Sequence, residues 1–438
     1  MKRTIKLALS ASLLLGATSA FATNGDVMIG QGAKSRSMGG VGIAKSFGAE
    51  SALANPAMIN SVENMEFTGA VTYFAPSVAF KSDAASNANP AAPAAVSEDS
   101  ATAASVIPEI MFAQRLSDSF VYGISINGVA GMGTDYDDTA SLTYASGTNG
   151  SFGMKTALSI LKISVPLAYT NSGFTIGLMP VFQYGTLQMS HMYDTQTGTP
   201  TAPIFAKLDN GSSSDTGFGF EVGLAYDVAA VKGLSLAAVY KSAIAMEYAN
   251  TISSSVAVFG GANATGIASG DKLDQPAEIG AGVSYEISGN TIALDVKQIQ
   301  WSAAAGYGDF GWEDQTVYAL GYEYAAKSWA VRLGYNYGAN PIAEQTSTTN
   351  PYGSAVQNFF NLSGFPGVVE SHMTLGGGYN ISDALSLDGS FVYAPEVTNS
   401  YDTTGMTSAF SGGLSTATST ADVTHSQMGL TLAMTYKF

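Results

Sequence analysis

Few side chains in this sequence could carry out catalysis. Cysteine is absent, which excludes disulfides, thiolate catalysis and cysteine metal sites, and the histidines are His191, His372 and His425. His425 stands between Thr424 and Ser426, but neighbouring residues on a strand point to opposite faces, so no Ser/His pair is expected there. No G-x-S-x-G elbow, Walker loop or metal-ligand histidine cluster occurs. The sequence therefore predicts no catalytic residue, no metal, no cofactor and no enzymatic activity.

Charged side chains within alternating apolar and polar segments are the second group that could act on a ligand. A buried Lys or Arg favours a carboxylate, so Lys297 and Arg332 are candidates to guide an anionic head group. Alternatively, and more commonly, such residues pair with one another and with nearby backbone. The residues of this group are Glu221, Asp295, Lys297, Glu323 and Arg332.

The first residues have the features of a secretory signal peptide, which we place at residues 1–22. Basic residues in Met1–Lys6 precede an apolar run from Leu7 to Leu15, and the segment ends in Ala20-Phe21-Ala22. The apolar run is too short to span a bilayer, which takes about 20 residues. Removal of the segment would leave 15 Lys and Arg against 34 Asp and Glu, a formal net charge of −19. Nucleic acid is therefore not an expected partner.

The composition after this segment indicates a transmembrane β-barrel. Charged residues make up only 12% of the chain, whereas it contains 49 Gly, 22 Tyr and 21 Phe. No continuous apolar run is long enough for a membrane helix. The membrane-spanning strands of a barrel instead alternate apolar residues that face lipid with polar residues that face the lumen. A soluble secreted β-protein is the competing class.

The end of the chain carries the clearest alternation. Apolar residues share one parity and mostly small polar residues the other, which is the pattern of a strand between lipid and a lumen. The terminal Phe438 resembles the last strand by which the outer-membrane assembly machinery recognises its clients. The apolar positions are Met428, Leu430, Leu432, Met434, Tyr436 and Phe438.

Turn residues divide the chain into strands joined alternately by short and long connections. Such alternation is typical of outer-membrane barrels, and six short plus seven long connections predict fourteen antiparallel strands with both termini in the periplasm. The short turns lie at 117–119, 171–173, 231–233, 288–290, 326–328 and 382–383, and the long loops near 82–105, 132–154, 191–213, 252–271, 303–312, 339–369 and 401–421.

Residues 23–64 do not alternate, and residues 65–438 would form the barrel. The segment 23–64 is rich in Gly and other small residues, and too apolar for a disordered tail. A fourteen-stranded barrel has a lumen wide enough to leak unless it is filled. We therefore expect residues 23–64 to be a plug inside the lumen.

The sequence resembles the FadL family of outer-membrane transporters, which take up long-chain fatty acids and, in some members, aromatic hydrocarbons. The likeness covers nearly the whole chain after residue 22. Gly30-Gln31-Gly32-Ala33, Ser37–Ala44 and Asn55-Pro56-Ala57 look like the family's N-terminal hatch, and residues 294–301, 332–342 and 364–379 look like its later strands. The resemblance implies capture of a hydrophobic ligand at the outer loops, an internal pocket, hatch movement and lateral exit at a kinked third strand.

The third predicted strand, Phe120–Ile126, runs into a glycine-rich stretch that suits such a kink. Asn127, Gly128, Gly131 and Gly133 fall within seven residues, and so many glycines rarely sustain a regular ladder. Family members often have Pro and an aromatic residue just after the first of these glycines, where this chain has Val129-Ala130. The start of an ordinary loop is the alternative.

Three loop phenylalanines, Phe359, Phe360 and Phe365, are candidates for the capture surface. A membrane-interface aromatic belt explains them equally well. The expected surroundings are outer-membrane lipid and lipopolysaccharide, and the expected state is a monomer. A general diffusion porin and a surface adhesin are the rival functions. The sequence does not distinguish fatty acids from hydrocarbons as the cargo. The excess of acidic over basic residues mildly favours neutral hydrocarbons.

Overall fold

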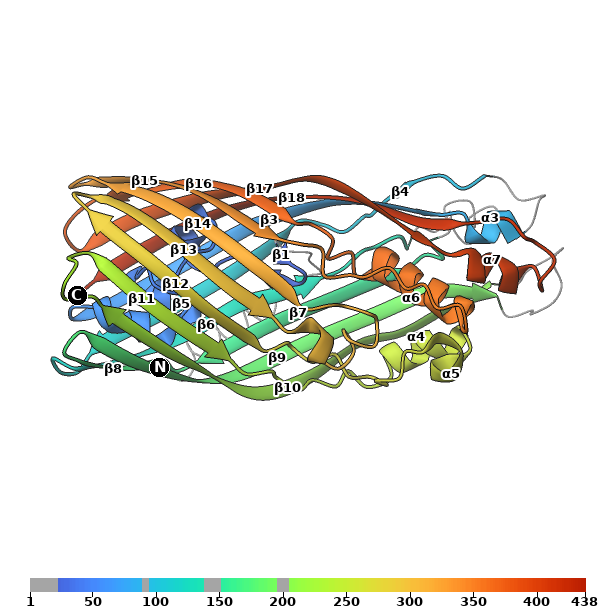
Figure 1. The fold of residues 1–438 in the computed structure, drawn as a ribbon, viewed down its shortest axis with the longest axis horizontal. Coiled ribbons are helices and arrows are strands. Elements are labelled where there is room, and N and C mark those ends of the chain that lie inside the picture. Colours follow the sequence, from blue (N-terminus) through green and yellow to red (C-terminus); the bar gives the residue numbers. More distant parts are fainter. Residues whose placement is uncertain (1–22, 89–93, 138–150, 195–204) are drawn as a thin grey trace.

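The computed structural model describes residues 23–88, 94–137, 151–194 and 205–438. The predicted signal peptide lies outside the described residues, as do parts of the predicted loops 82–105, 132–154 and 191–213. The described chain forms one antiparallel sheet that closes on itself (Figure 1). Closure occurs where β18 (Thr420–Lys437) pairs with β3 (Met65–Ser82), in register from Ala421 opposite Ser82 to Lys437 opposite Glu66.

The prediction of fourteen barrel strands is confirmed within the described residues. β7 and β8 count as a single strand interrupted at Val165-Pro166, because both pair with β9. The short β4 (Glu98–Asp99) pairs with the outer end of β3. The remaining wall strands are β5 (Ser105–Arg115), β6 (Phe120–Met132), β7 (Lys155–Ser164), β8 (Leu167–Asn171), β9 (Phe174–Asp194), β10 (Phe205–Asp227), β11 (Leu234–Lys241), β12 (Glu278–Ile287), β13 (Asn290–Ile299), β14 (Gln315–Ala325), β15 (Trp329–Gly338), β16 (Ser371–Asn380) and β17 (Leu385–Asp402).

The six predicted short turns all connect adjacent wall strands, but two long connections differ from prediction. β9 and β10 continue through most of the region 191–213, with a bulge between Asp209 and Ser212. Residues 209–216 of β10 are polar or Gly on both faces of the strand, so they show no apolar alternation in the sequence. The connection between β11 and β12 is longer than predicted, covering 242–277, and contains α4 (Ile252–Val258) and α5 (Gly261–Thr265).

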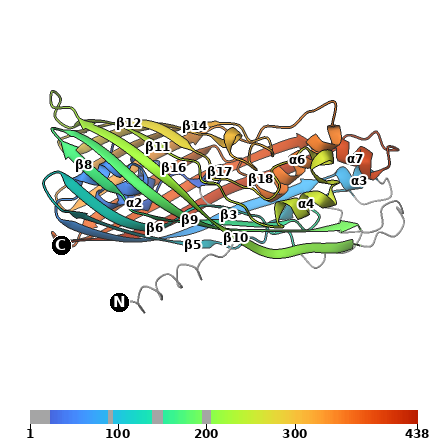
Figure 2. The same cartoon turned by 90° about the horizontal axis from the view of Figure 1, so that it is seen from below.

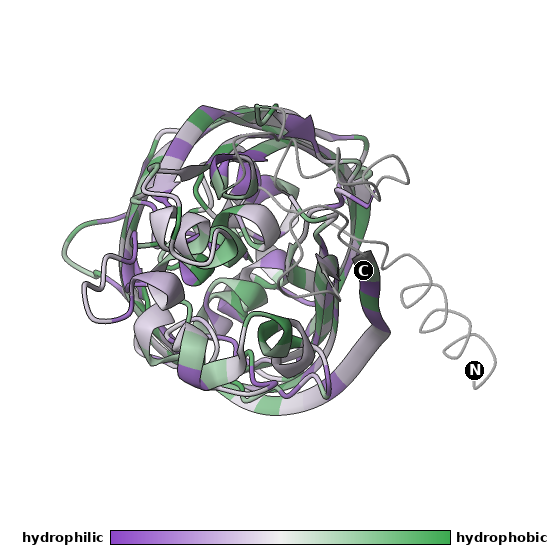
Figure 3. Ribbon diagram, turned by 90° about the vertical axis from the view of Figure 1, so that its right-hand side faces the viewer, coloured by the Kyte–Doolittle hydropathy of each residue, from purple (hydrophilic) through white to green (hydrophobic). Residues whose placement is uncertain are grey.

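Short helices gather at the end of the barrel opposite the C-terminus (Figures 1 and 2). They are α3 (Ala84–Ala88), α4, α5, α6 (Pro351–Gly364) and α7 (Thr404–Phe410). Seen along the barrel, helices lie within the ring of strands (Figure 3). The longest of them, α6, begins at Asn350, whose side chain accepts a hydrogen bond from the Gly353 N–H. Among the described residues, no helix has both the length and the apolarity needed to cross a membrane.

The wall is apolar outside and polar inside, the reverse of a soluble barrel. On β18, for example, Leu432 is 60% exposed whereas its neighbour Thr431 is buried. The inner face receives residues 23–64, which we call the hatch segment. It contains β1 (Thr23–Asn24), β2 (Val27–Met28), α2 (Gly32–Ser37) and two 3-10 helices, η1 (Gly48–Leu53) and η2 (Pro56–Ser61).

Arg36 of the hatch segment forms its strongest tie to the wall. The guanidinium donates two hydrogen bonds of 2.8 Å to the carboxylate of Glu109 on β5, and a third of 2.6 Å to Thr72 on β3. The guanidinium and the carboxylate are both buried. Loss of either partner would leave a buried charge uncompensated, which costs about 3–5 kcal/mol.

We predict that an arginine on the lipid face destabilises the barrel according to its depth. Leu432 lies in the middle of the exposed apolar run of β18, and Tyr436 lies near its end. Leu432→Arg should lower the free energy of unfolding by about 2–4 kcal/mol, and Tyr436→Arg by about 1 kcal/mol or less. Urea unfolding in phospholipid vesicles, followed by circular dichroism, measures both. Equal losses would contradict an outward-facing membrane band centred on Leu432.

Candidate functional site

The Asn55-Pro56-Ala57 motif joins two parts of the hatch segment to the wall. The side-chain oxygen of Asn55, Oδ1, accepts a hydrogen bond of 3.0 Å from the Ala57 N–H and so caps η2. Its amide nitrogen donates to the carbonyl oxygen of Ile43 at 2.9 Å and to that of Ala238 on β11 at 3.3 Å. One buried side chain therefore orients η2, the chain at Ile43 and the barrel wall together.

Glycines in the wall allow this close approach. A Cβ built on Gly223 of β10 would lie 1.8 Å from the Asn55 oxygen, and one on Gly177 of β9 would lie 2.2 Å from the Ala57 nitrogen. Neither glycine has a positive φ, so backbone conformation does not require them. They are needed because the motif packs directly on the wall backbone.

The opposite side of the hatch segment is held by polar side chains of the wall. The carboxylate of Asp295 accepts hydrogen bonds from the N–H groups of Gly42 and Ile43, at 2.7 and 2.8 Å. Thr374 accepts from the Gly39 N–H at 2.9 Å, and Asn336 donates to the Gly39 carbonyl at 3.0 Å. The wall thus satisfies hatch backbone groups that would otherwise be buried without partners.

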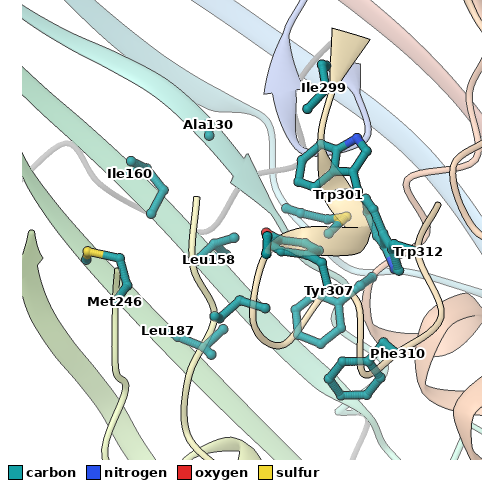
Figure 4. Close-up of a cluster of buried hydrophobic side chains, with 14 of the residues drawn as sticks. Ala130, Leu158, Ile160, Leu187, Met246, Ile299, Trp301, Tyr307, Phe310 and Trp312 are labelled. Carbon is teal, nitrogen blue, oxygen red and sulfur yellow. The ribbon is translucent and has the colours of Figure 1, made fainter. Parts of the chain in front are cut away.

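An aromatic cluster lies between the hatch segment and the outer helices. Trp301, Tyr307 and Trp312 face one another, with ring centroids 4.7–5.0 Å apart and interplanar angles of 57–63° (Figure 4). All three are buried. Gly25, between β1 and β2, packs so closely here that a Cβ on it would lie 2.6 Å from the Trp301 ring. The tip of the hatch segment therefore packs into this buried aromatic region of the barrel mouth. We call the region around Trp301, Tyr307 and Trp312 the aromatic chamber; its side chains fill it.

The side chains of α6 and the residue after it form the outer part of the same chamber. Phe359 and Phe360 are fully buried and Phe365 is 4% exposed. Phe360 contacts Phe259, with ring centroids 5.2 Å apart, and Phe310, at 6.1 Å. A membrane-interface belt requires exposed rings. Because all three rings are buried, they form neither such a belt nor an exposed capture surface in this structure.

Asp26 links the hatch tip to the outer loops by hydrogen bonds. Its buried carboxylate accepts from the hydroxyl of Tyr307 and from the amide of Gln275, the latter at 3.3 Å. Both donors belong to connections at the outer side of the barrel. Burial away from water raises the pKa of the Asp26 carboxyl to about 6, against the effect of these two hydrogen bonds. A shift of the aromatic cluster would therefore act directly on the hatch tip.

A cavity of about 80 Å³ lies between the hatch segment and the wall. Val27–Gln31 and other hatch residues form one side, and residues of β6, β7 and β10–β15 form the other. Ligand pockets usually have volumes of about 300–1,000 Å³. In the described state this cavity is therefore smaller than a typical ligand pocket. Its charged residues are Lys162, Glu221, Lys241, Glu278, Asp295 and Lys297.

The predicted ligand-guiding cations occupy different places. Lys297 lines the cavity and donates to Glu278 at 3.1 Å. Arg332 does not line it, and instead bonds to Glu323 at 2.6 Å and to Asp388 at 2.8 Å. Sequence reasoning missed Lys162, Lys241 and Glu278 as cavity residues. Their inward positions could have been inferred from strand parity, but each of the three residues lies at or near the end of its strand, where the alternation is hard to follow.

The third barrel strand, β6, does not end at Ile126 as predicted but continues to Met132. Its pairing with β5 stops at Asn127, opposite Glu109. Beyond that point β6 pairs only with β7, across a bulge between Gly128 and Ala130, and with Val27 of the hatch segment. The ladder of β5 and β6 is thus incomplete at its outer half. The error arose because glycines break the ladder on one edge of a strand without ending the strand.

These features match a family of outer-membrane proteins. A model of the family described as outer membrane protein transport protein (OMPP1/FadL/TodX) matches residues 14–438. The chain belongs to the FadL family. Its members' transport role agrees with the expectation drawn from the resemblance.

Three relatives of this FadL-family chain share between 15% and 24% of the aligned residues with it. A long-chain fatty acid transport protein of Escherichia coli O157:H7 is 24% identical over 245 residues, covering 49% of this chain and 52% of the relative, so the match spans about half of that protein. A FadL homologue of Pseudomonas aeruginosa superposes with a TM-score of 0.70 at 15% identity, covering 94% of this chain and all of that one. The Pseudomonas putida toluene transporter TodX superposes with a TM-score of 0.65 at 16% identity, covering 95% and 100%. These structures establish the common fold.

Groups that could support catalysis or metal binding are not brought together in the described part of this FadL-family chain. No cluster of three or more His, Asp or Glu side chains with metal-binding geometry is found there. His425 faces the carbonyl oxygen of Pro366 at 2.8 Å and Gln427 at 3.2 Å, and not a serine or threonine. His191 is buried against Phe259 and Phe360.

We predict that a single added methyl group on the wall loosens the hatch segment. Gly223→Ala places a Cβ against Asn55, so hydrogen–deuterium exchange of peptides from residues 42–57 should accelerate about tenfold, equivalent to about 1.4 kcal/mol. Gly69→Ala is the matched control, because the nearest atom to its Cβ is a Phe67 ring carbon at 3.6 Å. Unchanged exchange in Gly223→Ala would show that Asn55 does not hold the hatch segment.

Proposed function

We propose that this FadL-family chain transports hydrophobic small molecules, long-chain fatty acids or hydrocarbons, through the outer membrane. The observation that supports it most is the buried aromatic chamber in the barrel mouth, in contact with a hatch segment that fills the lumen below. A general porin needs an open polar lumen, and an adhesin needs no internal apolar chamber. Relatives described as a long-chain fatty acid transport protein and a toluene transporter favour the same cargo classes.

The proposed route begins at the aromatic side chains under the outer helices. A ligand displaces rings such as Phe360 and Trp312, and the hatch tip follows through its contacts at Gly25 and Asp26. The cavity beside Val27–Gln31 then widens. No group is assigned a catalytic role, so cargo leaves as it entered.

The proposed exit is sideways between β5 and β6, where their ladder is incomplete. Ile107 of β5 closes this gap from the inside together with Met28 and Ile29 of the hatch segment. Asn127, Gly128, Gly131 and Gly133 would supply the irregular backbone at the gap. Movement of β2, which pairs with Ala130, would uncover it. An apolar molecule would then pass into the lipid and not through bulk water.

The remaining proposals concern the setting of the protein in the envelope. Residues 1–22 act as a cleaved signal peptide, both mature termini face the periplasm, and Phe438 serves recognition by the assembly machinery. The helices at the opposite end then face outward, among lipopolysaccharide. A monomer suffices, because closure of the sheet leaves no wall strand without a partner in the described chain.

Uptake by cells tests the transport function. Cells whose outer membrane lacks other hydrophobic-compound transporters should accumulate labelled oleate or labelled toluene faster when they carry this protein. Empty-vector cells and cells with the Gly69→Ala variant are the controls. Protein-dependent entry of small sugars, with neither hydrophobic compound taken up, would favour the porin and overturn the proposal.

A reversible clamp tests the lateral exit. A Cβ on Gly128 would lie 4.0 Å from the Ile107 Cβ, within the spacing of a disulfide, and the chain has no native cysteine to interfere. Oxidised Ile107→Cys/Gly128→Cys protein should lose most of its uptake and regain it after reduction. The two single-cysteine variants control for each substitution. Full uptake through the oxidised protein would exclude this exit.

A further inference from the structure

The described lysines and arginines inside the barrel have their charges matched by carboxylates. Seven point inward, and each has an Asp or Glu oxygen within 3.9 Å of one of its nitrogens. An eighth, Arg115, sits at the base and donates to backbone carbonyls, including that of Val62 at 2.8 Å. The seven are Lys34, Arg36, Lys45, Lys162, Lys241, Lys297 and Arg332.

The pairing of charged side chains matters most at the cavity, because a ligand would pass the hatch segment there. Glu278 lies between Lys297 at 3.1 Å and Lys241 at 3.9 Å. Glu221 lies 3.8 Å from Lys162. With Asp295, the cavity is lined by three cationic and three anionic side chains. No positive charge is left over among its described residues.

Two charged side chains of this cavity, one cationic and one anionic, also bind the hatch segment. Lys241 also donates to the carbonyl oxygen of Leu53 in η1 at 3.1 Å. Asp295 is engaged by two N–H groups of the hatch segment. Recruiting one of these lysines to a ligand would break an ion pair and expose a buried carboxylate beside the ligand's own negative charge, which is costly away from water.

The aromatic chamber above offers no compensation. Its core contacts are rings, with Trp301, Tyr307 and Trp312 in tilted and edge-on arrangements. The buried ionisable groups in contact with its rings include Asp26, an acid bonded to Tyr307, and His191, which packs against Phe259 and Phe360. Burial disfavours the charged form of this histidine. An anionic head group entering here would meet a carboxyl group, whereas an uncharged ring or chain would only replace apolar contacts.

From this charge balance we infer that the cargo is uncharged: a neutral hydrocarbon, aromatic or aliphatic, and not a fatty acid anion. The inference rests on the proposed transport function and narrows its substrate class. Selectivity then follows from electrostatics, because a neutral molecule passes Glu221 and Glu278 without disturbing their lysines.

Matched pairs of compounds separate charge from size. The full chain in phosphatidylcholine vesicles is titrated with toluene and benzoate, and with oleyl alcohol and oleate, at about pH 9, where both acids are ionised even though a lipid interface raises the pKa of a carboxyl group. Tryptophan fluorescence reports binding, since Trp301 and Trp312 lie in the chamber. Each neutral member should bind at least about tenfold more tightly than its anion, about 1.4 kcal/mol. Cellular uptake of the labelled compounds should follow the same order.

A charge-neutralising variant tests the cause. Glu278→Gln leaves Lys241 and Lys297 without their shared partner, so the ratio of benzoate to toluene affinity should rise about tenfold. Glu221→Gln, which releases Lys162, provides a second test if the first variant does not fold. Glu313→Gln, in an exposed position outside the cavity, is the control and should leave the ratio as in the wild type.

The possible results distinguish failure of the neutral-cargo inference from failure of the proposed transport function. Wild-type binding and uptake of oleate or benzoate as strong as those of the neutral partner would overturn the inference and leave the transport function standing. An unchanged ratio in both charge variants would also overturn it. Binding and uptake of none of the four compounds would overturn the transport function itself.

Discussion

The bilayer leaves no water to satisfy backbone groups, and the rest of the structure depends on this constraint. The sheet has to close, which β18 and β3 achieve over the full length of both strands. Closure at fourteen strands creates a lumen too wide for the wall side chains alone to fill. The outer face has to be apolar, so polar side chains are turned inward. A filled interior with polar attachment points is the consequence.

The hatch segment uses those attachment points, and this explains how it is held. Asp295, Thr374 and Asn336 bind its backbone, and Glu109 binds Arg36. Apolar packing contributes at its tip, around Gly25 and Trp301, and in two smaller buried clusters formed with wall residues, one containing Ile43 and the other Met38. Hydrogen bonds and ion pairs can be exchanged for water when the segment shifts, whereas a fully apolar plug would have to expose its core. Polar anchoring below an apolar chamber is therefore compatible with opening in response to an apolar ligand.

Close approach of backbone to backbone is the second device on which the site depends. Gly177 and Gly223 allow the Asn55-Pro56-Ala57 motif to reach the wall, and a Cβ on Gly334 would lie 2.0 Å from the Gly39 nitrogen. These glycines sit in regular strands, where a glycine ordinarily weakens the ladder. Here their value comes from a contact with a segment more than a hundred residues away. Because hatch and wall backbones lie so close together, little space remains for the cavity between them.

Local pattern by itself determined the barrel class, the strand number, the short turns and the inward positions of Glu221, Asp295 and Arg332, because the alternation of a strand and the chemistry of a turn are set by neighbouring residues. Only the tertiary structure decided that β6 continues past Ile126, that Phe359 is buried and that Lys162, Lys241 and Lys297 share one cavity with Glu278. Those facts depend on which distant strands meet, on a bulge that affects one edge of a strand, and on a lumen whose contents alternation does not encode. The pairing of each cation with a particular carboxylate, and with it the charge that a ligand meets, exists only once the sheet has closed around the hatch segment.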